Sequence, residues 1–128
     1  MNFLKNNRGA TAVEFALVAL PVLYFILAIM QTAYIVWIVN LLHASVDTAA
    51  RCGAVGSTTP PCSGSGLANM QSTANAIFAA ANAAGSPTFP ANNCSGSGLT
   101  MAYNVTIVFV ANLPLTASSC YPTVLVPP

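Results

Sequence analysis

Residues 10–42 read ATAVEFALVALPVLYFILAIMQTAYIVWIVNLL, and this stretch decides the fold. Between Phe15 and Met30 it contains no charged or amide side chain. About 20 apolar residues are enough for a helix to span the hydrocarbon core of a bilayer, whereas the apolar region of a cleaved secretory signal is only about 7–15 residues long. The stretch therefore predicts a membrane helix that is retained in the mature protein.

The charges on either side of this stretch predict its orientation. Lys5 and Arg8 precede it, and the only cation that follows is Arg51. Short flanking segments that carry Lys and Arg stay in the cytoplasm, so the N-terminus is expected inside and the chain after about Leu42 outside.

The helical pattern continues beyond the membrane segment. It runs through residues 43–51, after which Cys52 and Gly53 are expected to stop it. A helix over residues 10–51 is roughly 60 Å long, about twice the thickness of the hydrocarbon core. Half of this helix is expected to span the membrane and half to stand outside it as a stalk.

The distal part of the chain lacks charge altogether. Residues 52–128 contain no Asp, Glu, Lys, Arg or His. Acid–base catalysis needs a group that titrates near neutrality, nucleic-acid binding needs clustered cations, and a zinc site needs His or carboxylates beside its thiols. We therefore expect no catalytic residues, no cofactor, no metal, no nucleic-acid partner and no small-molecule substrate.

Sequence patterns in the distal part predict a small α+β fold. Residues 56–66 are rich in Gly, Pro and Ser and predict a loop, and residues 67–85 predict a helix with Gly85 as its C-cap. After a second loop, apolar residues alternate along residues 101–113, which predicts a strand. The apolar positions at helical spacing in the first segment are Leu67, Met70, Ala74, Ile77, Phe78 and Ala81, and the alternating ones in the second are Met101, Tyr103, Val105, Ile107 and Phe109.

The partner of this strand is left open by the sequence. Residues 115–121 and residues 123–126 are both candidates, with a turn at residues 112–114. Either choice gives a long helix, a short helix and a small antiparallel sheet.

Four cysteines, all on the side expected to be extracytoplasmic, predict disulfides in this small domain. Four thiols allow three pairings. We favour one bond that closes the loop after the stalk and one that ties the strand region together. A zinc site is the rival, but the sequence has no CxxC pair and no accompanying His. The two favoured pairs are Cys52–Cys62 and Cys94–Cys120.

Glu14 is the most informative residue because it lies at the head of the apolar run. A charge inside a membrane costs of order 2–3 kcal/mol or more, so such a residue is usually functional and has a partner. The alternative is that Glu14 reaches the inner membrane surface beside Arg8. Asp47 and Arg51, four residues apart, are expected to form a helix-surface ion pair.

The N-terminal pattern resembles a known signal. A basic leader (MNFLKNNR), Gly9, four small or apolar residues (ATAV), Glu14 and the aromatic Phe15 precede the long apolar helix, and this order is similar to the type IV prepilin signal. Within that superfamily, RGATAVEFALVALPVL (residues 8–23) resembles the TadE-like family, the pseudopilins of tight-adherence (Tad, or Flp) pili. HASVDTAARCGAV (residues 43–55) and LTASSCYP (residues 115–122) also fit the layout of that family.

The resemblance implies a processing and assembly pathway. A prepilin peptidase would cut between Gly9 and Ala10, removing the leader (residues 1–9) and leaving a new α-amino group. The Glu14 carboxylate would then pair with the N-terminal amine of a neighbouring subunit and set the register between subunits. The family often has Tyr where Phe15 stands, so any role of that hydroxyl is absent here.

The implied product has three parts: the leader, a transmembrane and stalk helix (residues 10–51) and an extracytoplasmic domain (residues 52–128). The implied location is the bacterial inner membrane, and the implied partners are the peptidase and other pilin or pseudopilin subunits. Major pilins of these systems are little more than the helix, so the long distal part favours a minor pilin or pseudopilin. A TadF-like protein, a membrane-anchored binding protein outside any filament and, least favoured, a small envelope enzyme are the alternatives.

Overall fold

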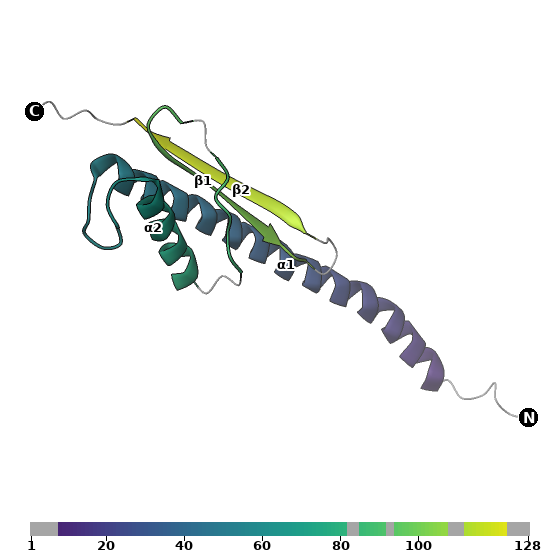
Figure 1. Cartoon of the computed structure of the whole chain (residues 1–128). Helices are drawn as coiled ribbons and strands as arrows, with labels where there is room; N and C mark the ends of the chain where they lie inside the picture. The colour runs from purple at the N-terminus through teal and green to yellow at the C-terminus, as the bar shows by residue number, and fades with distance from the viewer. Residues whose placement is uncertain (1–7, 82–84, 92–93, 108–111, 123–128) are drawn as a thin grey trace, which may run out of the picture. The chain divides into compact units, whose positions relative to one another are not determined.

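The computed structural model describes residues 8–81, 85–91, 94–107 and 112–122. It has the α+β layout expected from the sequence: a long apolar N-terminal helix, a short helix and a two-stranded antiparallel sheet (Figure 1). The chain divides into two compact units, one up to Tyr34 and one from Ile35 onward. The elements are α1 (Arg8–Val55), α2 (Leu67–Ala80), β1 (Ser97–Val105) and β2 (Leu113–Tyr121).

The first unit is the N-terminal part of α1, and its apolar side chains are exposed on every side. The large ones between Val13 and Met30 are 48–75% exposed. Within the part of the chain that the structure describes, α1 is the one helix long and apolar enough to cross a membrane, by length and composition. A helix that is apolar all round needs lipid or other helices around it.

The second unit has its core between α1, α2 and β1. α1 supplies a buried face at helical spacing, from Ile38 to Ala49, which begins in the predicted membrane stretch and continues into the segment expected to be the stalk. β2 lies against β1 and contributes a single residue to this described core. The members are Ile38, Leu42, Val46 and Ala49 from α1, Met70, Ala74 and Phe78 from α2, Leu99, Met101, Tyr103 and Val105 from β1, and Ala117 from β2.

α1 ends later than the sequence predicted. The expected stop at Cys52 and Gly53 is wrong, because the helix continues to Val55. Gly56 then takes a positive φ of 68°, and its N–H donates to the Cys52 carbonyl at 2.9 Å. This is the αL type of helix C-terminus, for which glycine is the usual residue.

Gly53 has a different role from a helix stop. It is buried, and a Cβ placed there would lie 2.3 Å from the Sδ atom of Met70. Glycine at this position therefore lets α2 approach α1 closely.

We expect Gly53→Ala to destabilise the domain, since overpacking of a core costs about 1–3 kcal/mol and the gain in helix propensity is at most about 1 kcal/mol. The measurement is thermal unfolding of the full-length protein in detergent. In a Met70→Ala background the steric overlap is gone, so the same substitution should become neutral or stabilising. Equal effects in both backgrounds would show that Met70 is not the cause.

α2 follows the predicted start but not the predicted end. It begins at Leu67 and ends at Ala80 with Ala81 as its C-cap, so the expected C-cap at Gly85 is wrong. Phe78 is the last buried residue of α2, and Ala79 and Ala80 are exposed. Without a buried face, further helical turns gain little from packing. Of the predicted face, Met70, Ala74 and Phe78 are buried, Ile77 and Ala81 are half-buried, and Leu67 is exposed.

The sheet confirms the alternating pattern but shifts its boundaries. β1 starts four residues before the predicted Met101 and ends at Val105; Phe109 lies outside the described residues. The first candidate partner is the correct one, because β2 pairs with β1 in an antiparallel register that sets Ser97 opposite Tyr121. The expected turn was partly wrong, since only Asn112 precedes the strand, with a positive φ of 56°. The second candidate, residues 123–126, lies outside the described residues.

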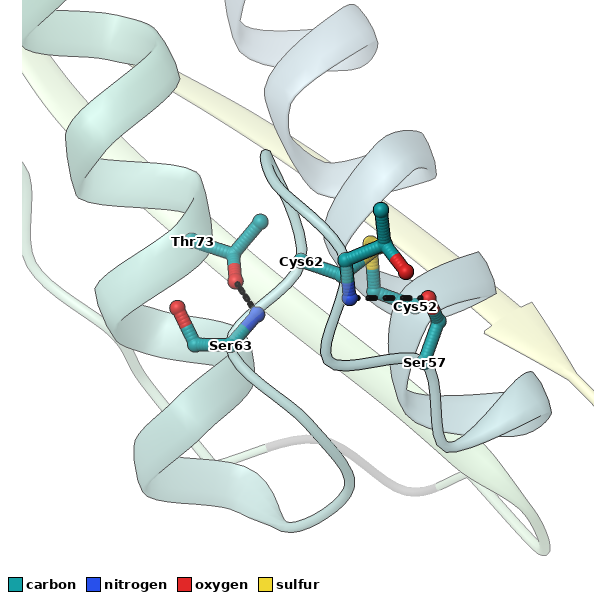
Figure 2. The surroundings of a disulfide bond; sticks show 6 residues. Cys52, Ser57, Cys62, Ser63 and Thr73 are labelled. Atoms are coloured by element: carbon teal, nitrogen blue, oxygen red, sulfur yellow. Dashed lines mark hydrogen bonds between the residues drawn. A yellow bond between two sulfur atoms is a disulfide. The ribbon is translucent and has the colours of Figure 1, made fainter.

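Two disulfides join the elements, with the pairing that the sequence favoured. Cys52 at the end of α1 bonds to Cys62, with a Cα–Cα distance of 5.4 Å, and Cys94 before β1 bonds to Cys120 in β2, with a Cα–Cα distance of 5.8 Å. Both distances are typical of disulfides. Figure 2 shows the first bond, beside which the Ser63 N–H donates to Thr73 Oγ1 at 3.1 Å and fixes the loop to α2.

Candidate functional site

The predicted cleavage point lies in the first turn of α1. The helix begins at Arg8, so the bond between Gly9 and Ala10 lies within it. Gly9 is exposed, and among the described residues beyond its own helical turn no atom lies within 4 Å of a Cβ placed there. Lys5 lies outside the described residues, and the side chain of Arg8 is not among those described.

Glu14 and Phe15 project from the next turn of the helix. Both side chains are exposed, Phe15 at 75%. Glu14 lies four residues after Ala10, about 6 Å along the helix axis. Among the described side chains, no cation lies beside the Glu14 carboxylate. The exposed side chains of Glu14 and Phe15 thus lie within two turns of the start of α1.

Asp47 and Arg51 form the ion pair that their spacing predicted. Arg51 Nε lies 3.3 Å from Asp47 Oδ2. The pair is extended by β2, which the sequence did not indicate. Arg51 Nε donates to the Tyr121 hydroxyl at 2.7 Å, and that hydroxyl donates to Asp47 Oδ1 at 2.5 Å. The Ser119 hydroxyl donates to the same Asp47 oxygen at 3.3 Å, so the end of β2 is fastened to α1.

This cluster holds Asp47 in its charged form. The hydrogen bond from Tyr121, with smaller contributions from Arg51 and Ser119, keeps the pKa of Asp47 below its ordinary value, although partial desolvation opposes the shift. Asp47 lies on the part of α1 that packs under the sheet, after the apolar membrane segment. Because its pKa is lowered in the folded state, the stabilisation is complete at neutral pH and is lost as the pH falls through that lowered pKa.

The local sequence carried no signal for Tyr121 and Ser119. Their hydroxyls meet Asp47 across 74 and 72 residues of chain, and only the fold brings them together. His43 is exposed and lines a shallow hollow with Ala44, Asp47, Ser118 and Ser119.

A long helix that is apolar all round at its N-terminal end, carries one acid near its start and is followed by a small disulfide-bonded domain has the layout of a pilin-like protein. The family model described as TadE-like protein matches residues 9–51, so this segment is similar to the TadE-like family. The proteins of that family are associated with the Tad pilus machinery. No curated protein and no solved structure matches the chain.

Proposed function

We propose that this chain is a minor pilin or pseudopilin subunit of a Tad pilus. A prepilin peptidase removes residues 1–9, and the N-terminal helix then assembles the subunit. One observation carries the proposal: the segment that matches the family begins at Gly9, and from there α1 presents an all-round apolar surface with Glu14 near its start.

The exposed apolar side chains of α1 must be shielded from water both before and after assembly. Before assembly, the large apolar side chains between Val13 and Met30 are shielded by lipid in the inner membrane. In a bundle of such helices, neighbouring subunits replace the lipid around the same side chains. The helix therefore serves first as an anchor, with the N-terminus in the cytoplasm, and then as the assembly element.

Cleavage and assembly are linked through charge. Removal of the leader creates an α-amino group at Ala10, one helical turn before Glu14. A carboxylate in apolar surroundings gains most from an opposite charge that assembly brings to it. An amine from a neighbouring subunit meets this need, and the pair sets the axial position of one helix against the next.

The second compact unit, from Ile35 onward and called the distal unit below, carries formal charges only at Asp47 and Arg51, which cancel. Its described core is built on α1 itself, so the unit is continuous with the assembly helix. Its size exceeds that of a pilin which is little more than a helix, and this supports a minor role in the filament.

The first test is the N-terminus of the mature protein. Mass spectrometry of the chain isolated from cells with an active prepilin peptidase should show a start at Ala10, and cells without the peptidase should retain Met1. Gly9→Val should block the cut, because the peptidase of this superfamily cuts directly after the glycine. Asn7→Ala, a matched change within the leader, should be processed normally. A mature start at Met1, or a cut near Ala28 as in a secretory signal, would exclude the proposal.

A further inference from the structure

We propose that the Cys94–Cys120 disulfide is an exchange site, at which an external dithiol protein breaks and re-forms the bond between β2 and the segment before β1 while the Cys52–Cys62 bond and the core stay intact. The inference does not depend on assembly into a pilus. It rests on three differences between the two disulfides: exposure, position in the sheet and contribution to the core.

The first difference is exposure of the sulfur-bearing residues. Cys52 is 3% exposed, within the last turns of α1, and Cys62 is half-buried. Cys120 is exposed, and Cys94 is half-buried. Cys120 also lines an open hollow of about 440 Å³ with Ser95, Gly96, Tyr121 and Pro122. A thiolate must reach a sulfur atom to exchange, so access favours attack on Cys120.

The second difference is the position of Cys120 on the outer strand. Ala102 of β1 exchanges both of its backbone hydrogen bonds with Thr88, on the side of β1 away from β2. In an antiparallel ladder the bonding direction alternates, so Cys120, opposite Gly98, also turns its backbone away from β1. Over the described ranges, no strand pairs with this outer edge of β2. The polypeptide of a partner can therefore approach Cys120 from the edge.

The third difference is the contribution to the core. β2 supplies Ala117 alone to the described core, with Leu115 packed against it. The remaining core side chains belong to α1, α2 and β1, and Cys52–Cys62 ties the end of α1 to the loop that precedes α2. Tyr121 and Ser119 also keep the end of β2 bonded to Asp47. Opening Cys94–Cys120 thus loosens the end of the ladder without removing core side chains.

The exchange balances as two thiol–disulfide steps. A thiolate of a Cys-x-x-Cys protein attacks Cys120 Sγ, forming a mixed disulfide, while Cys94 leaves as a thiolate and takes up a proton. The second thiol of the partner then attacks the mixed disulfide, loses its proton and releases Cys120 as a thiol. The partner dithiol is oxidised by two electrons and the protein disulfide is reduced by two. The reverse reaction closes the bond.

The test uses the oxidised full-length protein in detergent. A purified thioredoxin-type dithiol protein is added, samples are alkylated over time, and the labelled cysteines are counted by peptide mass spectrometry. Cys94 and Cys120 should be labelled at least about tenfold faster than Cys52 and Cys62, with the near-ultraviolet circular dichroism of the domain retained. Labelling of all four at one rate, earlier labelling of Cys52 and Cys62, or loss of the dichroism with the first bond would overturn the proposal.

A matched pair of variants tests the route of attack. Ser95→Phe places a ring at the hollow beside Cys120 and should slow labelling of Cys94 and Cys120 several-fold. Ser72→Phe, an exposed change on α2, should leave their rate unchanged. If the two variants exchange at the same rate, the hollow is not the route and the exchange site as proposed is wrong.

Discussion

Replacing Glu14 by Gln is expected to reduce incorporation of the subunit into the filament by about 100-fold or more, with cleavage after Gly9 largely retained. The proposed partner of Glu14 is the α-amino group of a neighbouring subunit. Removing one member of a buried ion pair leaves the other charge uncompensated and costs about 3–5 kcal/mol, and each 1.4 kcal/mol is a factor of ten in an equilibrium constant. Glutamine keeps the shape of the side chain, so the loss reports the charge.

The measurement compares the amount of subunit in sheared surface filaments with the amount in the membrane fraction. Glu14→Asp, which keeps the charge, should retain part of the incorporation. Thr32→Val is the matched control: it removes a polar group from the same helix, where the hydroxyl donates only to the Ala28 carbonyl within the helix. It should behave like the unmodified protein. Normal incorporation of Glu14→Gln would show that the amine pairing does not drive assembly.

The elements themselves could be predicted because each follows a short-range pattern. The long apolar run determined α1, helical spacing of Met70, Ala74 and Phe78 determined α2, and alternation from Met101 to Val105 determined β1. These patterns arise from the 3.6-residue and two-residue periods of the backbone, which are visible within a dozen residues of sequence. Their ends were less accurate, because packing decides where a helix or a strand stops.

Gly53 shows why an end was misplaced. Glycine after a helical pattern usually indicates a stop, but here it is a point of close approach to Met70, and the stop is three residues later at Gly56. The distinction depends on α2, which lies far along the chain. The role of Tyr121 could not be predicted for the same reason. Its hydroxyl bonds both Asp47 and Arg51, but it lies 70 or more residues away from them in the sequence.

For the candidate site too, short-range spacing could be predicted from the sequence and long-range partners could not. The positions of Gly9 and Glu14 follow from spacing within a single helix, so the sequence was sufficient to place them there. Their proposed partners are other molecules, and a single chain shows only that Gly9 and Glu14 are exposed. The five charges lie within the first 51 residues, and the two of them in the distal unit, Asp47 and Arg51, are engaged with β2.

The second large effect is expected from Phe78→Ala, which should destabilise the distal unit by about 3–5 kcal/mol. Phe78 is 1% exposed, and its ring lies 5.1 Å from the ring of Tyr103, measured between centroids. It joins α2 to β1, so its removal leaves a cavity between the two elements.

A loss of 1 kcal/mol lowers the Tm of a domain of this size by about 4–8 °C, so Phe78→Ala should lower the Tm of the full-length oxidised protein by about 12 °C or more. Leu67→Ala is the matched control, because it also shortens a large apolar side chain of α2, but one that is 53% exposed. Its effect should stay below about 1 kcal/mol. Equal losses for the two variants would contradict the packing of α2 on β1.

Cells degrade a destabilised domain faster because it is unfolded for a larger fraction of the time. Phe78→Ala should therefore also lower the amount of subunit in the membrane, with no change in cleavage after Gly9.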